Sequence, residues 1–122
     1  MKISLPPSLS YSQISCIVMD PITLAISILF LVPHIESLEK YQVNFRKVLL
    51  FSVSKSADDE EGDYVVGAVE LSSELDAQKI IDGISRKGII HTVPPERVFH
   101  LHVEGDICCD LVSEEYEIIR IN

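Results

Sequence analysis

The sequence predicts an α+β domain built mainly from antiparallel β-sheet, sandwich-like or strongly curved, with one helix near residues 73–87. Two observations carry this prediction. Several segments alternate apolar and polar residues with the period of two that is typical of half-buried strands. Only one segment carries an apolar stripe close to the 3.6-residue period of a helix. A chain of 122 residues has the length of a single domain, 1–122, and Pro6 and Pro7 suggest a loose N-terminal tail over residues 1–12.

Composition narrows the kinds of partner. A net charge of −9 repels nucleic acid and anionic membrane surfaces, so we expect neither as a partner. The same charge is compatible with a basic protein partner, or it serves only to keep the protein soluble.

The three cysteines are an odd number, and the adjacent Cys108 and Cys109 would point to opposite faces of a strand. This argues against a disulfide framework and for a reducing, cytoplasmic location. No signal peptide fits the start of the chain, because Pro6 and Pro7 interrupt any apolar core there.

Residues 14–32 are the most apolar stretch and have the length of a membrane span. Asp20 and Pro21 fall in its middle third, where a charge is costly and a proline breaks helical hydrogen bonding. We therefore predict a hairpin of two strands, residues 13–19 and 22–31, joined at these two residues. Both faces of the second strand are apolar, which predicts a homodimer or a hydrophobic partner bound through this hairpin.

Two more strands and the helix follow. Residues 43–54 place Val43, Phe45, Leu49, Phe51 and Val53 on one face, with Lys47 as the exception, and residues 64–71 form a shorter strand. The helix over 73–87 has Ser72 or Ser73 as its cap, acidic residues in its first turn and Gly88 at its end. Residues 89–93 form a short strand before a proline pair, and residues 116–121 form the last strand.

The stretch 98–112 predicts a β-hairpin whose register follows from its apolar residues. A three-residue loop at 104–106 gives one wholly apolar face, and burial of one face determines register. This register pairs Val103 with Ile107, Leu101 with Cys109, and Phe99 with Leu111. We expect these six residues to be buried together with Phe45 and Phe51.

The polar face of the same hairpin carries the candidates for metal binding or catalysis. His100 and His102 lie about 7 Å apart on one face, a spacing that metal sites use, and His91 could supply a third ligand. In the predicted register Asp110 lies opposite His100, so that His100 is a candidate general base and Asp110 the carboxylate that orients it. Cys108 lies opposite His102 and is a candidate nucleophile. The alternation of a sheet with a wet outer face generates the same pattern without any ligand. We therefore expect no metal, no cofactor and no catalytic residue, and keep a metal-binding or enzymatic domain as the alternative.

The loop over residues 56–63 holds five carboxylates, in Asp58, Asp59, Glu60, Glu61 and Asp63. Aligning Gly62 with the invariant glycine of an EF-hand loop puts Ala57 and Ala68 at positions that require carboxylates, so calcium ligation is not expected. Such a run either keeps a protein soluble or contacts a basic partner, and we take these five residues as the candidate partner-binding site.

The strand VNFRKVLLFSVS and the later segment RVFHLHVEGDICCDLVSEEYEII together resemble small bacterial proteins of the toxin-immunity type. The resemblance covers residues 43–121 and is one of strand pattern, so no functional residue is carried over. It implies a small cytoplasmic protein that acts by protein–protein binding, as an immunity-type inhibitor would.

Overall fold

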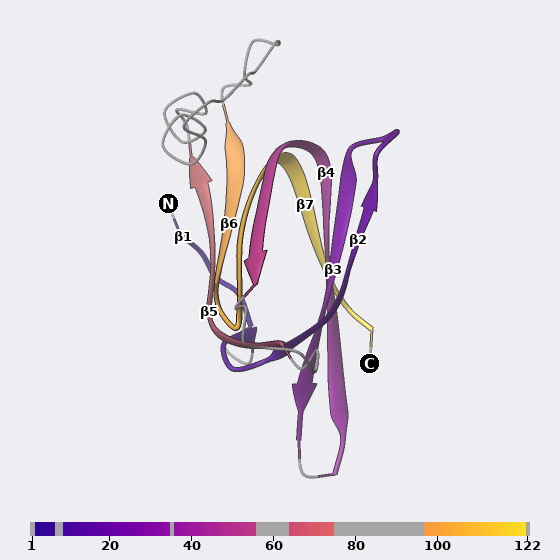
Figure 1. The fold of residues 1–122 in the computed structure, drawn as a ribbon, viewed down its shortest axis with the longest axis vertical. Helices are drawn as coiled ribbons and strands as arrows, with labels where there is room; N and C mark the ends of the chain where they lie inside the picture. The colour runs from indigo at the N-terminus through magenta and orange to yellow at the C-terminus, as the bar shows by residue number, and fades with distance from the viewer. Residues whose placement is uncertain (1, 7–8, 35, 56–63, 75–96, 122) are drawn as a thin grey trace.

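The computed structural model describes residues 2–6, 9–34, 36–55, 64–74 and 97–121 (Figure 1). The regular elements of this part are seven β-strands: β1 (Lys2–Ile3), β2 (Gln13–Asp20), β3 (Ala25–Pro33), β4 (Leu38–Lys55), β5 (Tyr64–Glu74), β6 (Val98–Gly105) and β7 (Ile107–Arg120). Every pairing between them is antiparallel, which confirms the prediction of a mainly antiparallel sheet.

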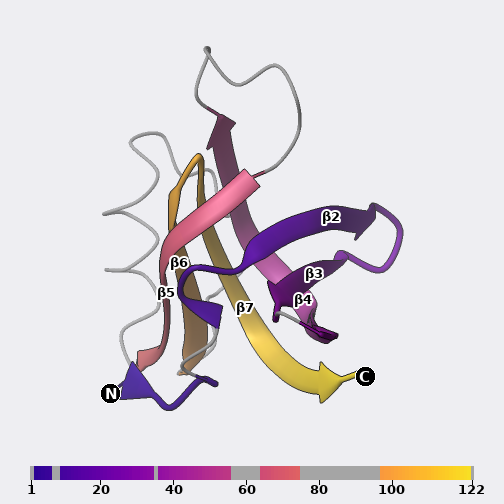
Figure 2. The same ribbon diagram turned by 90° about the horizontal axis from the view of Figure 1, so that it is seen from below.

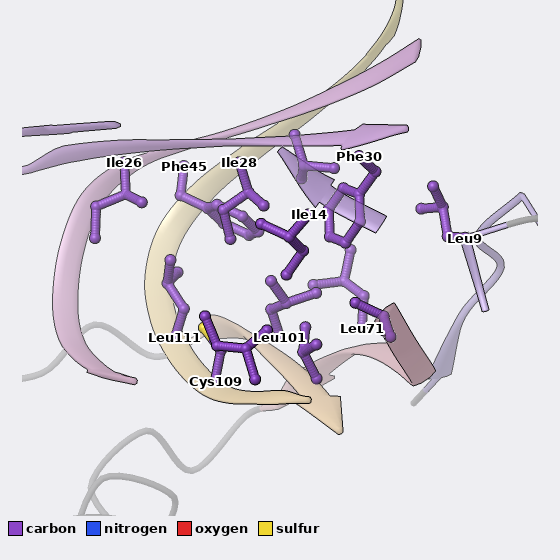
Figure 3. Packing of buried hydrophobic residues seen from close by; sticks show 14 of the residues in the cluster. Leu9, Ile14, Ile26, Ile28, Phe30, Phe45, Leu71, Leu101, Cys109 and Leu111 are labelled. Atoms are coloured by element: carbon purple, nitrogen blue, oxygen red, sulfur yellow. The ribbon is translucent and has the colours of Figure 1, made fainter. Parts of the chain in front are cut away.

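The strands form one sheet in the order β1-β5-β2-β3-β4-β7-β6, and β5 also pairs with β6. The sheet is strongly curved, because the long strands β4 and β7 pair along their length and bend over together into an arch (Figure 1). The arch brings the first hairpin, β2–β3, over the strands β5, β6 and the start of β7, so that the core lies between two layers (Figures 2 and 3).

The bend in β4 has a local cause. The register with β7 shifts between Val48 and Leu50, which is a β-bulge, and Lys47 adopts a left-handed φ of 52°. Val43 and Phe45, before the bulge, are buried, but Phe51 is only half-buried and Val53 is exposed. The predicted apolar face of this strand is therefore continuous only up to Phe45, because the bulge changes the strand's direction.

The N-terminal segment is not a loose tail in its described residues. Lys2 and Ile3 pair with Ser72 and Leu71 of β5, and Leu9 is buried in the core. Ser12 is also buried, and its hydroxyl donates a 2.6 Å hydrogen bond to the carbonyl oxygen of Leu9. This contact ties the segment to the core despite its prolines.

The first hairpin is present as predicted, with a longer turn. The Asp20 carboxylate accepts hydrogen bonds from the backbone N–H groups of Ile22 and Thr23, at 2.9 and 3.4 Å, so residues 21–24 form the turn and the second strand begins at Ala25 instead of residue 22. Strand β3 alternates in burial, and the residues of one face are buried: Ile26, Ile28, Phe30 and Val32.

The β6–β7 hairpin has its predicted faces and a different register. Val103 pairs with Cys109, Leu101 with Leu111, and Phe99 with Ser113, a slip of two residues from the predicted pairing. Of the residues expected to be buried, Leu101, Val103, Ile107, Cys109, Leu111 and Phe45 are buried, and Phe51 and Phe99 are half-buried.

Gly105 and Asp106 explain the slip. Instead of forming a tight turn, Gly105 pairs with Val66 of β5, and Asp106 exchanges two hydrogen bonds with the backbone of Val65, at 2.9 and 3.1 Å. A Cβ on Gly105 would lie 2.5 Å from the carbonyl oxygen of Val65, so only glycine allows this approach. A contact with a third strand thus decides the hairpin register.

Other predicted boundaries change. Ser73 and Glu74 belong to β5, so a helix does not begin at residue 73; residues 75–96, which hold the rest of the predicted helix and the predicted strand 89–93, lie outside the described residues. The strand predicted at 116–121 is not separate, because β7 runs without a break from Ile107 to Arg120.

The core lies between the two layers. Figure 3 shows Ile14, Ile26, Ile28, Phe30 and Phe45 facing side chains of the other layer across it, namely Leu71, Leu101, Cys109 and Leu111. A search of the described residues found no helix with the length and apolar character that a membrane crossing needs.

Candidate functional site

His100, His102 and Asp110 come together on the face of the β6–β7 hairpin that points away from the main core. Alternation along β6 sends Leu101 and Val103 into the core, so both histidines point to the opposite face, where they are partly buried. His100 Nε2 lies 2.9 Å and His102 Nδ1 lies 2.7 Å from the same atom, Asp110 Oδ1. All three side chains are partly buried, and the two imidazole rings are 6.2 Å apart between centroids.

Both predicted pairings of the two histidines were wrong. Asp110 lies directly opposite His102, and His100 lies opposite Val112, because of the two-residue slip. The carboxylate still reaches His100 diagonally, which adjacent strands allow. The outcome is a tighter cluster than the predicted one-to-one pairs.

His102 is held at both ring nitrogens. Its Nε2 lies 2.8 Å from Glu104 Oε1, while Nδ1 faces Asp110. Hydrogen bonds with Glu104, and then with Asp110, raise the pKa of His102 above its ordinary value, against the opposing effect of burial. Burial alone would raise the pKa of Asp110, but hydrogen bonds from His102 and His100, together with their charges, hold it below its usual value.

Sequence reasoning did not single out Glu104. The signal was present, because His100, His102 and Glu104 follow one another at intervals of two residues and so share one face of a strand. The residue was assigned to a tight turn instead, and β6 in fact continues to Gly105.

The cysteines do not join the cluster. The Cys108 thiol is exposed and lies 3.9 Å from the carbonyl oxygen of Gly105, and the predicted position opposite His102 is taken by Asp110. Cys109 is buried, and burial raises the pKa of its thiol to about 12, so it is not a thiolate near neutral pH. The geometry therefore gives no support to a cysteine nucleophile beside His102.

Two groups of predicted site residues fall outside the described residues: His91, and the acidic residues Asp58, Asp59, Glu60, Glu61 and Asp63. The structure therefore places neither the predicted third histidine nor the predicted partner-binding loop.

A second candidate site is an apolar pocket between the first hairpin and β4. Its volume is about 180 Å³, and all its lining residues are apolar: Met19, Leu24, Ile26, Val48, Leu49, Leu50 and Phe51. Its lining residues come from the end of β2, the turn after it, the start of β3 and the part of β4 that follows its pairing with β3.

Among the described residues, two strands bordering this pocket have a partner strand on one side only over part of their length. Strand β2 pairs with β5 only through Gln13 and Ile14, so residues 16–20 have one edge without a described partner strand. Strand β4 pairs with β3 only as far as Phe45. At the hairpin tip the apolar side chains are exposed, with 59% of Val18, 50% of Met19 and 91% of Ile22 accessible. An unpaired edge with exposed apolar side chains is a template for another strand.

No protein-family model matches this chain, and a search of curated proteins finds no relative of it.

Proposed function

We propose that this protein acts by binding a basic protein partner, which adds an extended segment to the unpaired edge of β2 and places an apolar side chain in the pocket beside it. The observation that carries the proposal is the pocket itself, because a pocket lined by apolar residues borders a strand edge that has no partner among the described residues. Its volume is about 180 Å³. On the same measure a single water needs only about 15 Å³, so the pocket has room for a group of several heavy atoms such as an apolar side chain.

Strand addition supplies both affinity and selectivity. Backbone hydrogen bonds along residues 16–20 would hold the partner segment, and alternate side chains of that segment would meet Val18 or the pocket. An alternating sequence is therefore the kind of segment that fits.

Leu24 supports a binding role for the hairpin tip. It lines the pocket, is 54% exposed and adopts a left-handed φ of 55°. This conformation costs a branched residue about 1–2 kcal/mol, and asparagine or glycine would avoid most of the cost. An apolar residue kept in a strained and half-exposed position is readily explained by a partner that covers it.

Charge favours a basic partner over a second copy of the chain. The net charge of −9 repels another copy and attracts a cation, and the five carboxylates of residues 58–63 follow β4 directly in the sequence. An inhibitor of the immunity type, which neutralises a basic toxin by covering it, would have these properties.

Titration of the isotopically labelled full chain with short peptides tests the proposal. A peptide that alternates valine and lysine should shift backbone amide resonances of β2 and of β4 near Leu50, and a peptide that alternates valine and glutamate should shift them far less. Met19→Lys should abolish the response by placing a charge in the pocket, whereas Ile119→Lys, at another exposed apolar position, should leave it intact.

The two variants separate a specific site from general stickiness. Equal response to the acidic and basic peptides, or a response that Met19→Lys does not reduce, would contradict the proposal. Circular dichroism of both variants controls for folding.

A further inference from the structure

The cluster on the β6–β7 hairpin combines three side chains of the two types, imidazole and carboxylate, that transition metals use. One ligand atom from each of His100, His102 and Asp110 lies within 4.8 Å of the other two, and all three residues belong to paired strands instead of loops. Sites on paired strands hold their side chains at nearly constant separation, which a metal site requires.

The distances fit a small divalent ion with little movement. Ligand atoms about 2.1 Å from a tetrahedral ion stand about 3.4 Å apart. The two nitrogens now lie 2.9 and 2.7 Å from Asp110 Oδ1, held by hydrogen bonds. An ion would replace the ring protons in these bonds, and the two separations would lengthen by about 0.5 and 0.7 Å, a movement within reach of small side-chain rotations.

Glu104 supplies an independent observation. A metal-binding histidine usually donates its other ring N–H to a carboxylate, which selects the tautomer and orients the ring. His102 has this arrangement, because its Nε2 lies 2.8 Å from Glu104 Oε1. With Nε2 protonated, the lone pair of Nδ1 points at the Asp110 carboxylate, which is also an acceptor. The space between the two atoms therefore holds either a second proton on the ring or a metal ion.

We propose that His100, His102 and Asp110 bind a divalent transition-metal ion of the zinc class, with Glu104 orienting His102. Two imidazoles and one carboxylate suit zinc and its neighbours, whereas magnesium and calcium prefer oxygen ligands alone. Three protein ligands leave one position of a tetrahedral ion open to solvent. Cys108 is not a ligand, because its thiol lies beside the Gly105 carbonyl.

Titration of the chelator-treated full chain with Zn²⁺ and with Co²⁺ tests this site. Calorimetry should show one equivalent bound, and Co²⁺ should give visible absorption without the near-ultraviolet band of a thiolate ligand. His102→Gln and Asp110→Asn should each abolish saturable binding, and Glu104→Gln should weaken it by about 10- to 100-fold.

Two matched controls make the result specific. His34→Gln removes a histidine that pairs with Glu39 elsewhere in the fold, and Cys108→Ser removes the neighbouring thiol; both should bind the metal like the unmodified chain. Circular dichroism establishes that each variant is folded, and Glu104→Gln tests the geometry without removing a ligand. Absence of binding to the folded chain, binding that survives His102→Gln, or binding that Cys108→Ser removes would overturn the proposal.

Discussion

Replacing Gly105 with alanine should destabilise the protein by about 3 kcal/mol. Gly105 lies at the end of β6, where the chain contacts β5 backbone to backbone. A Cβ at this position would lie 2.5 Å from the Val65 carbonyl oxygen, 2.8 Å from Val66 Cα and 2.9 Å from the Gly67 nitrogen. All three atoms belong to the backbone, so no change of side-chain rotamer can relieve the contact.

The magnitude follows from what must move. Overfilling a packed site costs about 1–3 kcal/mol. Separating β5 from β6 also weakens the two hydrogen bonds between Asp106 and Val65, now 2.9 and 3.1 Å, each worth about 1 kcal/mol. The two effects overlap, because the same displacement causes both, and about 3 kcal/mol is the expected total.

Gly67→Ala is the matched control. A Cβ on Gly67 would meet only the Glu104 carbonyl oxygen, at an ordinary contact distance of 3.5 Å. Because alanine restricts the unfolded chain more than glycine does, this variant should be as stable as the unmodified protein or up to about 1 kcal/mol more stable. Urea unfolding followed by circular dichroism measures both variants. If Gly105→Ala unfolds at the same urea concentration as the unmodified protein, or if both variants lose equal stability, the close approach of β5 and β6 is refuted.

Three further predictions concern the thiols, the hairpin tip and the turn. In the folded protein the exposed Cys16 and Cys108 should react with a thiol reagent near neutral pH. Cys109, whose pKa burial raises to about 12, should react only after unfolding. Rapid labelling of all three thiols would contradict the burial of Cys109. At high salt, which screens the net charge of −9 that otherwise repels a second copy, the hairpin of residues 14–32 should mediate a homodimer that competes with the basic partner, and Met19→Lys should suppress it; light scattering that shows a monomer at high protein and salt concentrations would exclude it. Hydrogen bonds from the backbone N–H of Ile22, and then from Thr23, lower the pKa of the Asp20 carboxyl in the folded protein. The Asp20 carboxylate therefore stabilises the fold fully above its pKa in the unfolded chain, near 3.8, and this contribution is lost as the pH falls through the lower folded pKa. Asp20→Ala should therefore lower the melting temperature at pH 7 and flatten its decrease in acid, whereas Asp20→Asn should keep most of the turn's stability because its amide oxygen still accepts both hydrogen bonds.

Alternation alone was enough to assign the two faces of the β6–β7 hairpin. It placed Leu101, Val103, Cys109 and Leu111 inside, and it placed His100, His102 and Asp110 together on the opposite face. The slip of two residues in the β6–β7 hairpin did not disturb this assignment, because side chains alternate with a period of two and a slip of two residues preserves the face. For the same reason, alternation along the strands was enough to place the three potential metal ligands on one face, without knowledge of their contacts.

Contacts between segments distant in the sequence decided the rest. The hairpin register depends on Gly105 and Asp106 meeting Val65 and Val66, some forty residues away, and hairpin-local patterning carries no information about that strand. The bulge after Lys47 depends on β4 bending with β7 across the core, and the bend opens the apolar pocket against Met19 and Leu24. Apolar periodicity specifies which side of a strand is buried. Packing of the whole sheet decides which strands pair along their edges and which edges stay unpaired.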